Sequence, residues 1–110
     1  MNDLDRVFSA LAEPTRRRVI ELLVGGPCRA SDLASQVGMQ PTAMSRHLRV
    51  LRTTGVVDVE SATDDARERF YKLRPEAFVA MQAWLDQVRA FWSEQLGSFK
   101  EHAERRGGRR

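Results

Sequence analysis

The sequence predicts a mainly α-helical domain with one small β-hairpin, in the order α-α-α-α-β-β-α. Apolar residues recur at helical spacing along most of the chain, and the spacing changes to strict alternation only after Gly55. The length supports the same prediction, because 110 residues with 42% hydrophobic side chains suffice for one small domain. A multi-domain enzyme with its own substrate lobe is not expected at this size.

The first two helices follow from their apolar stripe and from a proline. Residues 4–11 carry apolar side chains at positions i, i+3, i+4 and i+7, which predicts a short helix. Pro14 suits the first turn of a second helix, because a proline there loses no hydrogen bond. We expect this second helix to run from Thr15 to Val24, where the Gly-Gly-Pro of residues 25–27 ends it.

Two further helices with a tight turn between them are predicted next. The first covers about Ser31 to Gln36, and the second begins at Pro41, runs to about Thr53 and is closed by Gly55. The short gap indicates an αα turn. The offsets of a helix-turn-helix are occupied by Ala34, Gly38, Met44, Ser45 and Leu48.

The period of two after Gly55 predicts a β-hairpin. Apolar and polar residues alternate in Val57–Glu60 and again in Tyr71–Leu73, with a polar turn cluster at residues 61–66. A hairpin beside a helix-turn-helix makes the fold a winged helix-turn-helix. Pro75 then begins the longest helix, which we expect to end near Ala103.

The net positive charge of the chain comes from its C-terminal residues. Lys and Arg number 18 against 15 Asp and Glu, but four of the arginines lie in residues 105–110, and without them 14 basic residues face 15 acidic ones. Net charge alone therefore does not indicate nucleic-acid binding by the body of the chain. We expect residues 1–104 to form one folded domain and residues 105–110 to be a disordered basic tail.

Hydroxyls and guanidinium groups share one face of the second helix of the helix-turn-helix, and residues 41–54 include no acidic side chain. Arginine can bond both acceptors of guanine in the major groove, hydroxyls can bond base edges or phosphates, and the helix N-terminus adds partial positive charge. A solvated charged face is the usual interpretation of an arginine run. Here the turn, the missing acids and the hairpin favour DNA binding.

The hairpin and one histidine extend this prediction. Arg67 and Arg69 could lie against the DNA backbone or in the minor groove. His47 lies beside Met44 and Leu48, so packing and a phosphate contact both stay open. The candidate DNA-binding residues are Gln40, Thr42, Ser45, Arg46, His47, Arg49, Arg52, Arg67 and Arg69.

The apolar residues of the last helix predict a partner. Between Phe78 and Phe99 their spacing is close to a heptad seam, and part of this stripe would face water in a monomer, since only its first half could be intrachain core. We expect a homodimer in which this helix packs on its symmetry mate together with the first helix, placing two recognition helices on an inverted-repeat operator. The predicted interface residues are Leu4, Phe8, Met81, Trp84, Leu85, Val88, Phe91, Trp92, Leu96 and Phe99.

Several short segments between about residues 4 and 75 are characteristic when they occur together in one chain. They are Phe8–Arg18, Asp32–Ala34, Ser45–Leu51, Gly55–Val57 and the hairpin ending in Tyr71–Leu73. In these segments the chain resembles the ArsR (ArsR/SmtB-like) family of bacterial winged helix-turn-helix regulators. The resemblance implies a dimeric transcriptional repressor whose DNA affinity is changed by a signal. The aromatic final helix resembles the subgroup that lacks the familiar metal site.

The metal ligands of that family are not present in this sequence. Metal-sensing members have Cys-x-Cys directly before the Asp-Leu that is here Asp32-Leu33, where this chain has Arg29 and Ser31, with Cys28 one step out of register. The family's second site, on the final helix, has only His102. We therefore expect no metal and no cofactor. Cys28 is expected to be a small semi-buried filler, with an intersubunit redox contact as the alternative.

Other classes of function are weaker. Ser45 and His47 are two residues apart on one helix and cannot form a nucleophile–base pair, so no enzyme is expected. A protein-interaction or membrane-surface module and a sequence-indifferent architectural DNA binder stay open as alternatives. The chain has no apolar run of about 18 residues and no signal-peptide pattern at its N-terminus, and with a single cysteine it is expected to be cytoplasmic.

Overall fold

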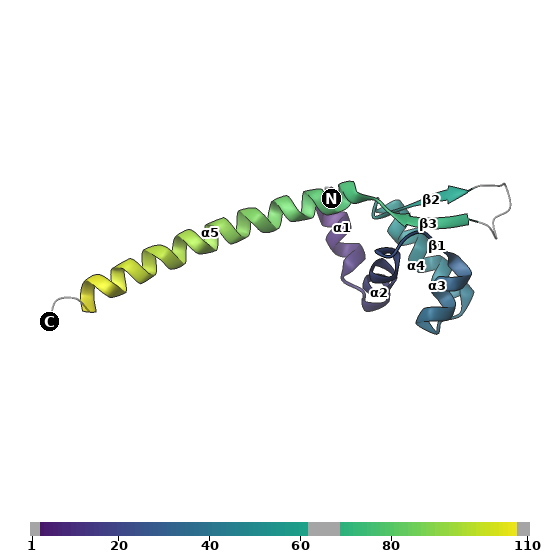
Figure 1. Ribbon diagram of the computed structural model, residues 1–110, viewed down its shortest axis with the longest axis horizontal. Coiled ribbons are helices and arrows are strands. Elements are labelled where there is room, and N and C mark those ends of the chain that lie inside the picture. The colour runs from purple at the N-terminus through teal and green to yellow at the C-terminus, as the bar shows by residue number, and fades with distance from the viewer. Residues whose placement is uncertain (1–2, 62–68, 108–110) are drawn as a thin grey trace. The chain divides into compact units, whose positions relative to one another are not determined.

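The structure, a computed structural model, describes residues 3–61 and 69–107 and is shown in Figure 1. Its elements are α1 (Asp3–Leu11), α2 (Pro14–Leu23), β1 (Cys28–Arg29), α3 (Ala30–Val37), α4 (Pro41–Thr53), β2 (Val57–Ser61), β3 (Arg69–Leu73) and α5 (Pro75–Gly107). The chain divides into two compact units, residues 1–79 and 80–110. This division falls within the region 1–104 that the sequence predicts as one domain, and α5 spans it.

The first unit contains a three-stranded antiparallel sheet in which β3 is the central strand. The strand order is β1-β3-β2, so Tyr71 of β3 pairs with Cys28 on one side and with Val59 on the other. The guanidinium of Arg29 lies 5.1 Å from the centre of the Phe70 ring, which adds a cation–π contact between β1 and β3. Because β3 forms backbone hydrogen bonds with a strand on each side, it is held more firmly than a strand of an isolated hairpin.

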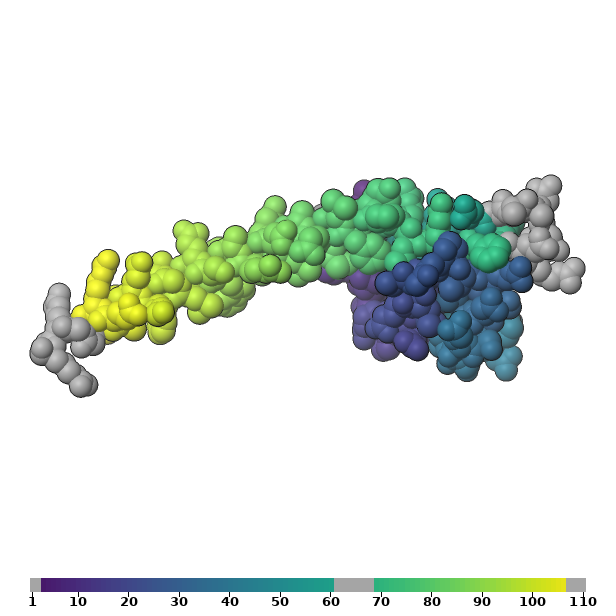
Figure 2. Space-filling model, in the orientation of Figure 1, coloured from purple at the N-terminus to yellow at the C-terminus, as the bar shows by residue number. Residues whose placement is uncertain are grey.

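One hydrophobic core joins the helices of this unit to the start of β2. On the face shown in Figure 2, these elements pack without a visible gap. The helix-turn-helix supplies five of the buried residues, as expected from its apolar positions. The buried side chains are Val7, Ala10, Val19, Leu23, Leu33, Ala34, Met44, Leu48, Leu51, Val56 and Val57.

Glycine turns fix both ends of α4. Gly38 has φ 78°, a left-handed conformation that glycine adopts without steric cost, and Met39 N–H donates to the carbonyl of Ala34 at 2.9 Å. Gly55 has φ 83°, and the N–H of the next residue, Val56, donates to the carbonyl of Leu51 at 2.9 Å. These bonds satisfy the last carbonyls of α3 and α4, so the direction of α4 relative to α3 is set by the turn predicted from the sequence.

The structure corrects the predicted elements in two places. The strand β1 was not predicted, because two residues carry no recognisable alternation. The helix α5 continues to Gly107 instead of ending near Ala103, so Arg105 and Arg106 are helical and do not begin a disordered tail. Arg67, most of the hairpin turn and residues 108–110 lie outside the described residues.

Candidate nucleic-acid interface

The helix α4 has two faces of different character. Met44, Leu48 and Leu51 are buried and fasten one side of the helix to the core. Every residue of the predicted stripe is exposed on the other side, and Gln40 is exposed at the N-cap. Neither the Gln40 side chain nor any acidic residue of the first turn covers the N–H groups at this end. The stripe consists of Thr42, Ser45, Arg46, Arg49 and Arg52.

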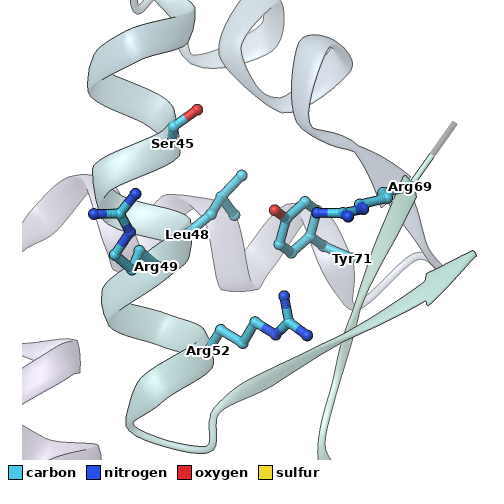
Figure 3. A pocket seen from close by; sticks show the side chains of 6 residues that line it. All are labelled: Ser45, Leu48, Arg49, Arg52, Arg69 and Tyr71. Atoms are coloured by element: carbon cyan, nitrogen blue, oxygen red, sulfur yellow. The ribbon is translucent and has the colours of Figure 1, made fainter. Parts of the chain in front are cut away.

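A pocket of about 240 Å³ lies between α4 and β3 (Figure 3). Two stripe arginines and Ser45 line it from α4, and Arg69 lines it from β3 together with Tyr71, while buried Leu48 contributes an apolar wall. Four predicted DNA-binding residues therefore meet at one place. Tyr71 is the member that the sequence prediction missed, although its i+2 spacing from Arg69 puts both on the same face of a strand.

Three arginines of α2 are engaged with protein groups. Arg16 Nε donates to the carbonyl of Ala10 at 2.6 Å, and Arg17 Nη1 donates to the carbonyl of Leu11 at 2.7 Å, so both close the C-terminal end of α1. Arg18 pairs with Glu21. Within residues 3–61 and 69–107, the structure gives no hydrogen bond or ion pair to the guanidinium groups of Arg46, Arg49, Arg52 and Arg69. The guanidinium groups available to a ligand thus include those of the predicted interface.

The structure places His47 away from the stripe. Its Nδ1 lies 3.7 Å from Oε2 of Glu13, and the two side chains are 21% and 35% exposed. Glu13 is the N-cap of α2 and also accepts a hydrogen bond from Arg16 N–H at 2.9 Å. Of the two interpretations left open by the sequence, this geometry favours packing over a phosphate contact.

The pKa of Glu13 is lowered from its ordinary value of 4.5. Partial burial raises the pKa, but the N–H of Arg16, the nearby His47 and the Thr15 hydroxyl all favour the ionised carboxylate and outweigh it. Ionised Glu13 therefore stabilises the folded chain at neutral pH. As the pH falls below 4.5, the unfolded chain binds the proton first, and the contribution is lost once the pH passes the lowered folded pKa.

We therefore expect Glu13→Gln to reduce stability at neutral pH and to flatten its dependence on pH in the acid range. The variant keeps a side-chain oxygen for the cap but has no proton to bind. Urea unfolding at neutral pH and at several values below 4.5 measures the effect. Glu21→Gln, at an exposed position on the same helix, is the control. If Glu13→Gln and the wild type lose stability in parallel on acidification, the Glu13 carboxylate does not stabilise the fold.

The residues predicted to form a dimer interface differ in exposure along α5. Met81 and Val88 are half-buried, as are Leu4 and Phe8 of α1. Large apolar side chains remain exposed over the rest of the helix, with Trp92 at 58% and Phe99 at 72%. The exposed members of the predicted interface are Trp84, Leu85, Phe91, Trp92, Leu96 and Phe99.

In the described part of the chain, no group of three or more His, Cys, Asp and Glu side chains is arranged to hold a metal ion. Cys28 is half-buried as a free thiol, with its Sγ 3.5 Å from the carbonyl of Gly26. Among the helices described here, none is both long and apolar enough to cross a bilayer.

The chain is similar to known bacterial regulators. Residues 13–59, which include the helix-turn-helix, match the family model "Bacterial regulatory protein, arsR family". The HTH-type transcriptional regulator Rv2034 of Mycobacterium tuberculosis is 33% identical over 103 residues, which cover 94% of this chain and 91% of that protein.

Solved structures show the same fold. The crystal structure of the ArsR family transcriptional regulator RHA00566 has a TM-score of 0.75 and 32% identity, covering 84% of this chain and 98% of the other. A homodimeric winged helix-turn-helix DNA-binding domain from Mycobacterium bovis, solved by NMR, has a TM-score of 0.62 and 27% identity, covering 80% and 78%. The fold is thus the predicted winged helix-turn-helix, and the chain belongs to the ArsR family of DNA-binding bacterial transcriptional regulators.

Proposed function

We propose that this protein is a homodimeric repressor that binds an inverted-repeat operator in double-stranded DNA. In this proposal α4 enters the major groove, and Thr42, Ser45, Arg46 and Arg49 contact base edges. Gln40 and Arg52 lie at the two ends of the stripe, and Arg69 approaches from the hairpin. Arg67 is retained from the sequence prediction, while His47 is left out because it faces Glu13.

The observation that carries the proposal is the division of α4 into a buried side and an exposed cationic side. Three apolar residues fix the helix, so the opposite side chains are presented in a constant orientation. Because the described residues give these guanidinium groups no ion-pair partner, polyanion binding does not require an existing pair to break.

Dimerisation is supported by the exposed aromatic side chains of α5 and by the homodimeric relative from Mycobacterium bovis. A stripe of two tryptophans and two phenylalanines on one helix is typical of a protein–protein interface. A two-fold axis would present two α4 helices to two half-sites of an inverted repeat, whose centres lie about 34 Å apart, one turn of DNA. Repression is implied by the family resemblance. Because a bacterial operator lies on DNA in the cytoplasm, we also propose a cytoplasmic location.

Selection of bound fragments from sheared bacterial genomic DNA, followed by titration of the selected duplex, tests this function. We expect specific binding at least about a thousandfold tighter than binding to a scrambled duplex at the same salt concentration. The affinity for both duplexes should fall steeply with ionic strength, because Arg side chains displace counterions from phosphates.

The result separates this function from the two alternatives. A steep salt dependence without any preferred sequence would identify an architectural DNA binder instead. No binding to duplex DNA at low salt would identify a protein-interaction module. In either case the proposed operator recognition would be wrong.

A further inference from the structure

We propose that the pocket between α4 and β3 holds one backbone phosphate of the bound DNA, and that Tyr71 is a DNA-contact residue that donates its hydroxyl to this phosphate. The inference rests on the proposed function and deepens it. It divides the interface into base-contacting residues in the N-terminal part of α4 and an anchor made jointly by Arg52, Arg69 and Tyr71.

The chemistry of the pocket wall indicates an anionic ligand. Of its six lining residues three are arginines, two carry hydroxyls and none is acidic. Arg52 and Arg69 bring two guanidinium groups to the pocket without a counter-charge, which is unfavourable, and a phosphodiester would supply that charge. The apolar wall at Leu48 limits hydration on one side, which strengthens hydrogen bonds to a bound anion.

Figure 3 shows how the lining side chains divide between two tasks. Arg52 extends from α4 toward Tyr71, and the Tyr71 hydroxyl points back toward α4. The guanidinium of Arg49 is directed away from Tyr71 in this view, to the other side of α4. Arg49 is thereby free for a base, whereas Arg52, in the last turn, lies beyond the N-terminal residues of a recognition helix that contact bases.

The hydroxyl of Tyr71 is available for this role. Tyr71 is half-buried in the central strand, and its backbone is paired on both edges, so its position is fixed before DNA binds. Its hydroxyl has no hydrogen-bond partner within residues 3–61 and 69–107 and is not buried, so it is open to a ligand that enters the pocket. A phosphate oxygen would accept its hydrogen bond.

Tyr71→Phe tests the inference because it removes only the hydroxyl. We expect about tenfold weaker binding to both the selected and the scrambled duplex, since a phosphate contact carries no sequence information. The salt slope should stay constant in this variant, because the hydroxyl is neutral. Arg52→Gln and Arg69→Gln should each lower the slope by about one, whereas Lys72→Gln, on the opposite face of β3, should leave it unchanged.

Methylphosphonate substitution identifies the phosphate with the wild-type protein, independently of any effect on folding. The selected duplex is synthesised with one neutral methylphosphonate at each backbone position in turn. We expect one position per half-site at which the substitution weakens wild-type binding but has a much smaller effect on Tyr71→Phe. If no position is coupled to Tyr71 in this way, the inference is wrong.

A competition experiment separates a DNA phosphate from a free anion with the same chemistry. Inorganic phosphate should displace DNA no better than chloride does at equal ionic strength. If inorganic phosphate displaces DNA with a saturable dependence on its concentration, and Tyr71→Phe abolishes this effect, the pocket binds a free anion. The assignment to a DNA phosphate is then overturned. If Tyr71→Phe, Arg52→Gln and Arg69→Gln bind as the wild type while Arg46→Ala and Arg49→Ala bind more weakly, the anchor is wrong and the operator function stands. If the wild type binds no duplex at all, both proposals fall.

Discussion

Trp92→Glu is expected to convert the protein from dimers into monomers. Trp92 is 58% exposed in the single chain, in the middle of the apolar stripe of α5. In the proposed dimer it is buried against the partner subunit, where a carboxylate has no counter-charge and would lose its hydration. The dimer should weaken by at least about 3 kcal/mol, more than a hundredfold in the dissociation constant. Sedimentation velocity over a range of protein concentrations measures the change.

The control for this experiment is Ala90→Glu. Ala90 is exposed on the same helix, two residues earlier and therefore about 200° away around its axis. The Ala90→Glu substitution adds the same charge outside the apolar stripe, so the dimer should stay intact. If Trp92→Glu sediments as the wild-type dimer does, the α5 seam is not the interface. DNA affinity should fall in Trp92→Glu and not in Ala90→Glu, because a single subunit contacts only one half-site.

Arg46→Ala and Arg49→Ala are expected to lower the affinity for the selected operator by about 1–3 kcal/mol each. Both side chains are exposed on α4, and no core residue contacts depend on their guanidinium groups. A lost base contact should weaken operator binding more than binding to a scrambled duplex, so the specificity ratio should fall. This distinguishes them from Tyr71→Phe, whose expected effect is equal on both duplexes. Fluorescence anisotropy at fixed salt measures both affinities.

Arg18→Ala is the matched control for these substitutions. It removes the same charge from α2, where Arg18 is paired with Glu21 on the surface. Its effect on either duplex should be small, because Arg18 lies outside the predicted interface and its charge is already paired. If Arg46→Ala and Arg49→Ala bind both duplexes as tightly as the wild type does, α4 is not part of the DNA interface and the proposed function is wrong.

The sequence predicts elements well where the determinants are local. The apolar period of residues 4–11, the proline at Pro14 and the glycine turns at Gly38 and Gly55 each act within a few residues, and the structure has the corresponding elements. The strand β1 depends on pairing with β3, more than 40 residues away, and nothing in the residues Cys28–Arg29 signals it. The end of α5 was placed too early because the apolar stripe stops at Phe99, whereas the charged residues that follow are themselves good helix formers.

The candidate site shows the same limit. The exposed stripe on α4 was predictable because helical periodicity alone separates it from Met44, Leu48 and Leu51. The meeting of this stripe with Arg69 and Tyr71 could not be derived, since it depends on how the sheet packs on the helix. The sequence does not decide the orientation of His47 either, because His47 faces Glu13, which lies 34 residues earlier in the chain. Tertiary contacts decided both cases.

The strict division of α4 into a buried and an exposed side has a practical consequence. Folding depends on the apolar side, so the side chains at Thr42, Ser45, Arg46 and Arg49 can be exchanged with little loss of stability. Libraries randomised at these positions should yield repressors for new target sites on an unchanged scaffold.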